Sequence, residues 1–579
     1  MIVLENFSFG FPQKDLYDGI SFAIENGKHC ALIGSSGSGK STLVDMIKDA
    51  ERFMYDGKLE VHTKRKIGFV SQFTNFKKES DITVFNFVAE EFLKLENDAK
   101  SLCQEMETSI EIEEILERYQ SVLDSIEALG GSAYENVIHS QLNMAGLEKQ
   151  KDLCLSELSG GEIKLIQIIK EMLTSPELLI MDEPDVFLDF GNLNSLKKLI
   201  NAYHGTILII THNRYLLDHC FDKIVHLEDK KVQEFDGNYL DYNFSMLQRK
   251  IELQELSVAD EVEIKRNEKI IDRLRETASY NADAANGKSL HARVKIQERL
   301  LTRKVKEPFV DIRQPQIHFS TNLVTNDVVA LSVKDYEVMF DEVLLEHVNF
   351  DILSTDKVAL IGPNGAGKTT IFRDIMNGNN KCISIDECIE IGYLSQVQGE
   401  VLKESNTVLD EFLELGFSKN SEVKEYLTQY GFEEEILKQQ INSLSGGEKN
   451  NLQLAKLSYG NANLLLLDEP TSHLDTYSQI ALEEAINDYE GAVLMVSHDF
   501  YTIINCMDYI LTIDENTIRK ISIRKFRKTI YAKYFDRDYL LIEQKKKEVE
   551  IKIGKALEKR EFEEAKNILE ELEKLIQLL

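Results

Sequence analysis

Two segments of the chain combine closely spaced glycines with a lysine and a hydroxyl residue, which suits them to holding phosphate groups. Both fit the pattern G-x-x-x-x-G-K-[S/T]. Glycines let successive backbone N–H groups curl around phosphate oxygens, the lysine bridges terminal phosphates, and the hydroxyl helps to hold Mg²⁺. The predicted phosphate-binding residues are Gly34, Ser35, Ser36, Gly37, Ser38, Gly39, Lys40, Ser41 and Thr42, with Gly362, Pro363, Asn364, Gly365, Ala366, Gly367, Lys368, Thr369 and Thr370.

Paired acids occur at the ends of two apolar runs, as Asp182-Glu183 and Asp468-Glu469. A histidine follows 29 residues after each glutamate. Phosphoryl transfer needs its charge neutralised and its nucleophile oriented, and it needs little covalent help. Acids and a lysine at fixed spacing are the parts that this chemistry requires.

A third element, the sequence Leu-Ser-Gly-Gly-Glu, also occurs twice, at 158–162 and 444–448. In both copies the serine lies 24 residues before the glutamate of the acid pair, Glu183 or Glu469. An ordered set of motifs that keeps its spacing twice indicates an internal duplication.

The elements that must position these residues can be read from the flanking sequence. Apolar runs at 30–33 and 358–361 precede the two glycine loops, and an amphipathic stretch follows each of them. This is the strand–loop–helix context in which the helix N-terminus adds its positive dipole end to the phosphate site. The acids likewise end apolar strands, so an α/β fold is predicted for each copy.

The first copy carries 42 residues that the second lacks, since Lys40 to Ser159 spans 119 residues and Lys368 to Ser445 spans 77. The extra residues lie near 87–130, where apolar residues at helical spacing predict a projecting helical hairpin, here called the arm. The arm has a net charge of -9, which suits a basic protein partner; a plainly solvated helix face is the alternative.

Between the copies, Leu240, Phe244, Leu247 and Ile251 follow a heptad seam, and a second helical pattern runs from Leu290 to Val305. Two helices joined by a tip are predicted. Residues 264–306 sum to +7 and residues 519–547 to +8, whereas the whole chain has a net charge of -32. Because charges are screened beyond ~8 Å at physiological salt, nucleic acid should meet these local basic segments.

The tail continues with a second heptad seam over 562–579, which predicts a short helical hairpin with the helix containing Ile542, Val549 and Ile553. Packing on the second copy and a further contact with nucleic acid are alternatives. The chain has no run of ~18 apolar residues and no secretory signal, so a cytoplasmic protein that does not span a membrane is expected. Seven cysteines without a C-x-x-C pair argue against a disulfide framework or a zinc site.

The duplicated motifs, with Gln72 and Gln396 after strands, the arm and the basic linker, resemble the ABC-F translation factors, which are tandem ATP-binding cassette ATPases. The resemblance covers nearly the whole chain. It implies an α/β fold with two P-loop ATP-binding cassettes in tandem, an inserted helical arm, a helical-hairpin interdomain linker and a short C-terminal helical extension. We place the first cassette at 1–240, the linker at 241–307, the second cassette at 308–528 and the extension at 529–579.

The resemblance also implies ATP and Mg²⁺ as cofactors and assigns roles to individual residues. Glu183 and Glu469 would polarise the attacking water, and His212 and His498 would sense the γ-phosphate. Each Leu-Ser-Gly-Gly-Glu segment, called the signature below, would close over the nucleotide of the other cassette. An aromatic ring would stack on adenine, although a core role is equally open for Phe11, the candidate in the first cassette. The Mg²⁺ set is Ser41, Thr369, Gln72, Gln396, Asp182 and Asp468; the closing residues are Ser159, Gly160, Gly161, Ser445, Gly446 and Gly447; the stacking candidates are Phe11 and Phe340.

In this family the cassettes bind at the ribosomal E-site, the linker reaches toward P-site tRNA and the peptidyl-transferase centre, and some members relieve inhibition by large-subunit antibiotics. The resemblance implies a monomeric ATPase with cassettes paired within the chain. It would bind rRNA and tRNA through 264–306, with a further contact at 519–547, and stalk proteins through the arm. A DNA-associated tandem cassette ATPase and the ATPase subunit of a transporter with separate membrane chains are the alternatives. The short tail argues against the first, and the arm and linker against the second.

One loop departs from the family pattern. After Glu469 the chain reads Pro-Thr-Ser-His-Leu-Asp, near the usual form, but after Glu183 it reads Pro-Asp-Val-Phe-Leu-Asp. Because this loop crosses between cassettes in the family, the hypothesis is that the two sites communicate asymmetrically.

Overall fold

The computed structural model describes residues 2–12, 14–63, 66–72, 82–108, 112–186, 188–280, 291–297, 315–321, 328–339, 343–535, 548–549, 552–557 and 559–577. The chain divides into two compact units. The first joins Met1–Asn238 to Arg313–Ile530, and the second joins Tyr239–Ile312 to Tyr531–Leu579. The first unit therefore holds both sets of duplicated motifs.

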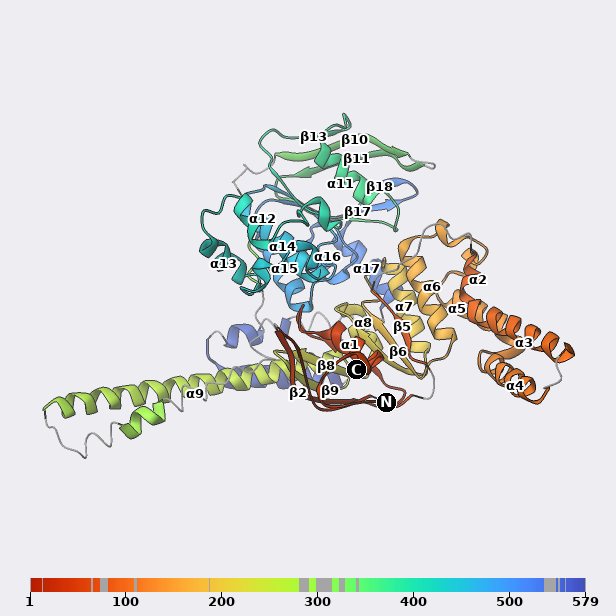
Figure 1. Ribbon diagram of the computed structural model, residues 1–579. Coiled ribbons are helices and arrows are strands. Elements are labelled where there is room, and N and C mark those ends of the chain that lie inside the picture. Colours follow the sequence, from red (N-terminus) through yellow and green to blue (C-terminus); the bar gives the residue numbers. More distant parts are fainter. Residues whose placement is uncertain are drawn as a thin grey trace. The chain divides into compact units, whose positions relative to one another are not determined.

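Each cassette is built around a β-sheet with helices beside it (Figure 1). Both sheets have six strands, and the two strand orders are the same. The order is β5-β6-β7-β3-β8-β9 in the first cassette and β14-β15-β16-β12-β17-β18 in the second. Neighbouring strands are parallel except for the last pair in each sheet, which is antiparallel. The strands are β3 (His29–Ile33), β5 (Gly68–Val70), β6 (Leu178–Asp182), β7 (Thr206–Ile210), β8 (Lys223–Glu228) and β9 (Lys231–Asp236), and then β12 (Lys357–Ile361), β14 (Ile391–Leu394), β15 (Leu464–Asp468), β16 (Ala492–Val496), β17 (Tyr509–Asp514) and β18 (Thr517–Ser522).

Each cassette also has a three-stranded antiparallel sheet, with two strands before the phosphate loop in the sequence and one after it, and the strand order again matches. Tyr17 in the first cassette and Leu345 in the second come from these sheets and lie against glycines of the phosphate loop. The sheets thus brace the loops. Their strands are β1 (Ile2–Phe11), β2 (Lys14–Ile24) and β4 (Asp56–Val61), and β10 (Val329–Met339), β11 (Val343–Leu353) and β13 (Ile383–Ile385).

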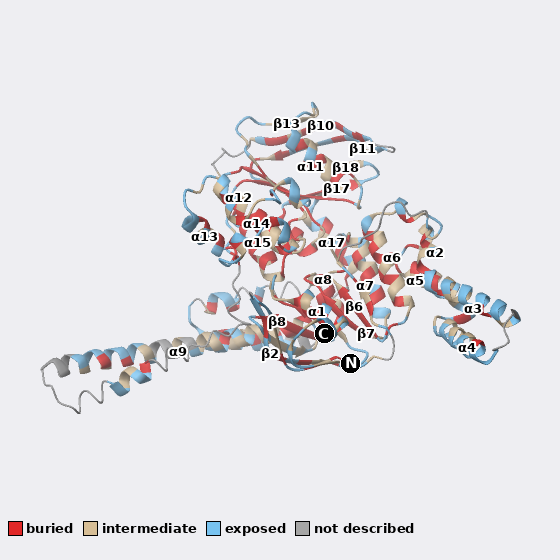
Figure 2. Ribbon diagram, in the orientation of Figure 1, coloured by how far each residue is buried: buried red, intermediate tan, exposed pale blue. Residues whose placement is uncertain are grey.

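The central strands consist of continuous apolar runs because both faces of each sheet are covered. Every residue of β7 and of β16 is buried, which is the pattern of parallel strands packed between layers. Figure 2 shows this buried material concentrated in the strands and in the helices beside them. These helices are α1 (Lys40–Lys48), α2 (Val84–Val88), α5 (Tyr134–Met144), α6 (Gly160–Leu173), α7 (Phe190–Ala202) and α8 (Arg214–Cys220), and α11 (Lys368–Asn377), α12 (Val408–Glu414), α13 (Asn420–Thr428), α14 (Gly446–Tyr459), α15 (Thr476–Asp488), α16 (Phe500–Cys506) and α17 (Ile523–Tyr534).

The arm is a pair of helices, α3 (Glu90–Thr108) and α4 (Ile112–Ala128), which lie side by side. Leu102 and Ile115 are buried, whereas most of the other arm residues are exposed (Figure 2). The predicted helical hairpin is confirmed, and its acidic side chains face solvent.

The linker begins with a single helix of 42 residues, α9 (Tyr239–Tyr280), and residues 291–297 form part of a second helix. Asn267, only 3% exposed, donates hydrogen bonds to the Gln297 side chain at 2.7 Å and to the Arg293 carbonyl at 3.2 Å. A buried amide pair of this kind has few alternative partners, so it favours one register of the helical hairpin. Of the predicted tip, Tyr280 to Leu290, only Tyr280 lies within the described residues.

The C-terminal seam packs against the base of α9. Helix α19 (Phe562–Gln577) buries Leu569 and Leu572 together with Val549, Ile553 and Ile251, the last from α9. The Lys566 ammonium also pairs with the Glu255 carboxylate at 2.7 Å. The predicted return of the seam on Val549 and Ile553 is confirmed, although Ile542 lies outside the described residues.

None of the described helices contains an 18-residue window apolar enough to cross a lipid bilayer.

We predict that Leu569→Ala loosens the base of α9. Leu569 is 6% exposed, and truncating a buried leucine costs about 2–5 kcal/mol, so amide hydrogen exchange over 244–255 should accelerate by at least about thirtyfold. Leu256→Ala is the matched control on the same helix, since Leu256 is 59% exposed. Equal exchange rates in the two variants would contradict a bracing role for the extension.

Candidate functional site

The two phosphate loops have the same internal geometry. The Lys40 ammonium donates to the carbonyls of Gly34 and Ser35, both at 2.8 Å, and Lys368 donates to those of Gly362 and Pro363 at 2.8 and 2.9 Å. Among the described residues, no side chain caps the N-terminus of α1 or of α11, so their first N–H groups can bind an anion. Burial lowers the pKa of both lysines, because it disfavours the charged ammonium groups. A bound phosphate would stabilise the charged form.

The paired acids stand where the central strands β6 and β15 end. Glu183 and Glu469 both adopt left-handed backbone conformations, with φ of 45° and 52°. Each backbone N–H donates to the last residue of the neighbouring strand, Ile210 or Val496, at 2.9 Å. A non-glycine residue held in this region is strained, and such strain is typical of sites where a side chain must be aimed.

The acids next to them form a site suited to Mg²⁺. Burial raises the pKa of both Asp182 and Asp468 to about 6, partly offset by the nearby hydroxyls of Ser41 and Thr369. Asp468 is 1% exposed, and neither of its carboxylate oxygens makes a hydrogen bond of normal geometry to the described residues. A buried carboxylate in that condition fits a divalent cation held by oxygen ligands.

The repeated Leu-Ser-Gly-Gly-Glu sequences are helix N-termini. In each, the serine accepts a hydrogen bond from the glutamate N–H while the glutamate side chain accepts from the serine N–H, which is a capping box. The glycines therefore form the first turn of α6 and of α14, in which Gly160 is exposed and Gly161 and Gly447 are buried. In this arrangement the positive end of each helix dipole is presented outward.

Each signature lies against the phosphate loop of the other cassette. A Cβ atom added at Gly447 would lie 2.6 Å from the Ser36 hydroxyl, and one added at Gly161 would lie 3.2 Å from the Asn364 side-chain nitrogen. At the second site a cavity of about 510 Å³ is lined by Ser159, Gly160 and Gly161 of the first cassette and by residues of the second, among them Gly365, Thr370 and Gln396. The structure thus brings together the residues that the sequence assigned to opposite cassettes.

At the first site, a loop from the second cassette reaches Glu183. The Glu183 Oε2 atom lies 2.5 Å from the Gln72 amide nitrogen and 3.2 Å from the His473 Nδ1 atom, and Gln72 and His473 are 3.1 Å apart. The Asp475 carboxylate accepts a hydrogen bond from the Ser36 backbone N–H at 3.0 Å. Sequence reasoning identified this crossing loop but assigned no role to His473 or Asp475.

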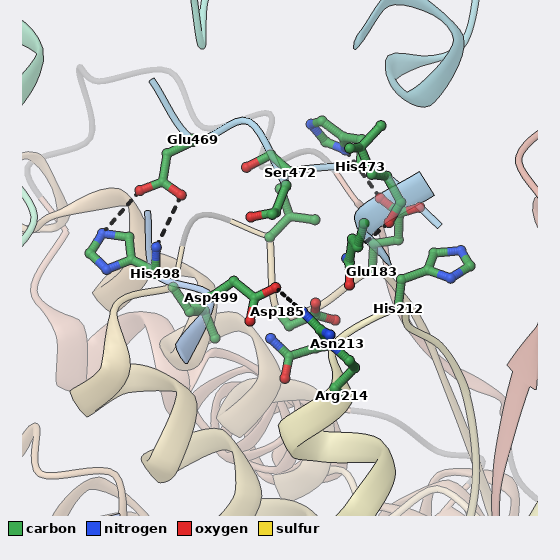
Figure 3. A pocket seen from close by; sticks show the side chains of 15 residues that line it. Glu183, Asp185, His212, Asn213, Arg214, Glu469, Ser472, His473, His498 and Asp499 are labelled. Carbon is green, nitrogen blue, oxygen red and sulfur yellow. Dashed lines mark hydrogen bonds and ion pairs between the residues drawn. The ribbon is translucent and has the colours of Figure 1, made fainter. Parts of the chain in front are cut away.

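At the second site the acid is paired within its own cassette. The His498 Nε2 atom lies 3.4 Å from the Glu469 Oε1 atom, and the His498 backbone N–H donates to Oε2 at 3.3 Å (Figure 3). The position four residues after the first glutamate, which corresponds to His473, is Phe187, and it lies outside the described residues. A side chain that can hydrogen-bond is thus replaced by one that cannot.

This difference changes the electrostatics of the two glutamates. Burial alone would raise the pKa of Glu183, but the His473 hydrogen bond and the nearby His212 hold it below its ordinary value. Burial, reinforced by Asp468, instead raises the pKa of Glu469 to about 8. The histidines behave alike, because burial and the adjacent lysines lower the pKa of His212 to about 4 and of His498 to about 3.

A lysine that sequence reasoning missed supports Gln72. The buried Lys164 ammonium on α6 donates to the backbone carbonyls of Ser71 and Gln72, and burial lowers its pKa to about 8. The equivalent position on α14 is Asn450, which donates instead to the carbonyls of Pro470 and Ser472 at 2.9 and 2.7 Å. One signature helix thus holds the strand end that carries Gln72, and the other holds the crossing loop.

The adenine-stacking candidates differ in their outcome. Phe11 ends β1, is 49% exposed, and faces Lys14, whose ammonium lies 3.4 Å from the Gly37 carbonyl of the phosphate loop. With half of its surface exposed, Phe11 is not a core residue. Phe340 lies outside the described residues.

Comparisons with known proteins agree with this arrangement. Residues 17–186 and 345–472 match the ABC transporter family. ATP-binding protein YdiF of Bacillus subtilis is 30% identical over 542 residues, which cover 90% of this chain and 81% of that protein. ABC transporter F family member 2 of Arabidopsis thaliana is 30% identical over 526 residues, covering 86% and 74%. A crystal structure of an archaeal ribosomal stalk protein with the archaeal ribosome recycling factor shares the fold, with a TM-score of 0.50 at 17% identity over 89% of this chain and 90% of that chain.

We predict that Gly447→Ala lowers the ATPase rate by roughly tenfold. The new methyl group would lie 2.6 Å from the Ser36 hydroxyl and 2.7 Å from the His473 carbonyl, so α14 could not approach the first phosphate loop without strain of ~1–3 kcal/mol. Gly460→Ala, at the other end of α14, is the control, since its nearest neighbour would be the Leu457 carbonyl at 3.4 Å. Steady-state phosphate release measures both, and equal rates would show that the close approach is not needed.

Proposed function

The chain belongs to the F family of ABC transporter ATPases, and on that premise we propose that ATP closes its cassettes, that the closed protein binds the ribosome, and that hydrolysis releases it. ATP hydrolysis then acts as a timer for a binding event. The observation that carries the proposal is a stripe of exposed basic residues on α9, in a chain whose net charge is -32.

The nucleotide chemistry is proposed for the residues gathered at the cassette interface. Lys40 and Lys368 would neutralise terminal phosphates, and the Asp182 and Asp468 carboxylates would hold Mg²⁺ with Ser41 and Thr369. The ion, when bound, supplies positive charge to the phosphates. Glu183 and Glu469 would orient the attacking water. Neutral His212 and His498 can donate or accept a hydrogen bond at the γ-phosphate.

The basic stripe lies on one face of the linker. Lys265, Lys269 and Arg273 recur every four residues on α9 and are exposed, and Arg266 and Lys295 are exposed beside them. The neighbouring acids have partners, because Glu268 accepts from Gln297 at 3.2 Å and Asp272 pairs with Arg275 at 3.6 Å. A helical surface of this kind suits the phosphate backbone of rRNA or tRNA.

A second basic surface lies on the second cassette. Arg524, Lys525 and Lys528 of α17 are exposed, whereas Phe526 and Ile530 on the opposite face are buried. The charged face is therefore anchored to a folded core, which favours a further rRNA contact. The basic residues at 537 and 545–547 lie outside the described residues.

The arm is proposed to meet a basic protein of the ribosome, such as a stalk protein. Its acids face solvent on both helices, and the exposed Ile112 and Leu116 offer apolar contacts among them. Protection from large-subunit antibiotics is a further expectation of the resemblance, and the tip on which it would depend lies outside the described residues. The DNA-associated and transporter alternatives are separated from ribosome binding by the first experiment below.

We predict that the double variant Glu183→Gln, Glu469→Gln accumulates on ribosomes when ATP is present. Without the acids the closed form should persist, because hydrolysis cannot reset it. Sedimentation through a sucrose gradient measures the association, and the same variant with ADP is the control. Recovery with DNA or with membranes, and none with ribosomes, would reject the proposal.

We further predict that changing Lys265, Arg266, Lys269 and Arg273 to Gln weakens ribosome binding and flattens its salt dependence. Loss of four phosphate contacts should reduce the slope of log K against log salt by about three. The control changes four exposed lysines of the second cassette to Gln: Lys403, Lys419, Lys424 and Lys438. If the two quadruple variants bind alike at every salt concentration, the linker is not the main nucleic-acid contact.

A further inference from the structure

One arginine of the first cassette is buried among acids of the second. The Arg214 guanidinium lies 2.5 Å from the Glu483 carboxylate and 2.9 Å from the Asp499 carboxylate, and all three side chains are at most 15% exposed. It also donates to the Thr502 hydroxyl at 3.3 Å and stacks over the Tyr501 ring at 4.8 Å. This group of residues is called the Arg214 cluster below.

The cluster joins the two loops that carry His212 and His498. Arg214 follows His212 by two residues, and Asp499 follows His498 directly. Figure 3 shows the Arg214–Asp499 contact between the two candidate sites, beside a small cavity of about 70 Å³ whose lining includes both glutamates and both histidines. A shift of either loop must therefore break the cluster or move the other loop.

The equivalent positions of the two cassettes carry different charges. Glu483 stands eight residues after Asp475, and the residue eight after Asp189 is Lys197. Asp499 corresponds to Asn213, and Arg214 corresponds to Phe500, which is buried and packs against Phe526 at a ring distance of 6.4 Å. The first cassette thus has two cations where the second has an anion and an apolar ring.

We propose that the Arg214 cluster is a pairing determinant, which selects first-to-second cassette pairing within one chain and holds the two histidine loops in register. Two first cassettes from different chains would set Arg214 against Lys197 and Asn213, so like charges would meet. Two second cassettes would set Phe500 against a pair of carboxylates. Because the groups are shielded from solvent, salt screens these preferences weakly. Arg214 is a positioning residue, since it touches no reacting group.

The test uses the full chain and a double-mutant cycle of neutral variants. Arg214→Gln should lower the ATPase turnover by about tenfold and bring the Hill coefficient for ATP toward 1, because it leaves two buried carboxylates unpaired. Glu483→Gln should lose less, since Arg214 keeps Asp499. The double variant should lose no more than Arg214→Gln alone, as expected for interacting partners.

A charge swap separates pairing from simple stability. Arg214→Glu should abolish cooperativity, and Arg214→Glu with Glu483→Arg should recover at least half of the parent turnover, with circular dichroism and melting to verify folding. Arg52→Glu is the control, because Arg52 pairs with Asp49 at 2.6 Å but its side chain is 78% exposed. The proposal is overturned by strictly additive losses in the neutral cycle, or by an Arg214→Gln variant with the parent's Hill coefficient. If the charge-reversed variants misfold, the cycle of neutral variants still tests the proposal.

Discussion

The close approach of each signature helix to the opposite phosphate loop is the constraint on which the rest of the structure depends. At Gly447 there is no room for a Cβ atom, because the Ser36 hydroxyl and the His473 carbonyl occupy that space. The helix can approach the phosphate loop this closely because its first turn consists of glycines. Its capping box, formed by Ser445 and Glu448, stabilises the helix N-terminus that faces the phosphate loop. At the other site the approach is less close, because a Cβ atom at Gly161 would lie 3.2 Å from the Asn364 side-chain nitrogen.

The interface between the cassettes buries several charged side chains, and each of them is stabilised by different partners. The lysines of the phosphate loops donate hydrogen bonds to backbone carbonyls. The buried carboxylate oxygens of Asp468 are suited to binding a cation. Glu183 is held ionised by His473 from across the interface, whereas Glu469 has a raised pKa and a histidine from its own cassette. Two sites with one fold therefore enter the ATP cycle from different electrostatic starting points. The Arg214 cluster, made of unlike charges at equivalent positions, adds a contact that a symmetric pair could not form.

The appended elements use local charge within an acidic chain. The arm, the linker and α17 each present a single dominant sign to solvent, so a partner within a Debye length meets that segment rather than the average. The linker is also stiffened twice, by the buried Asn267–Gln297 pair along its length and by the C-terminal helices at its base.

The sequence alone determined the duplication, the strand–loop–helix units, the arm and the linker helix, because glycine spacing and apolar periodicity are local signals that the backbone must obey. Through the resemblance, it also implied that each signature closes over the phosphate loop of the other cassette. It could not assign His473, Lys164 or Arg214, since each acts on residues 90 to 400 positions away in the chain, and nothing in their local sequence states that distance. It also left the C-terminal seam with several partners. Only the tertiary structure decided these points, because which buried group meets which charge depends on how two similar surfaces pack together.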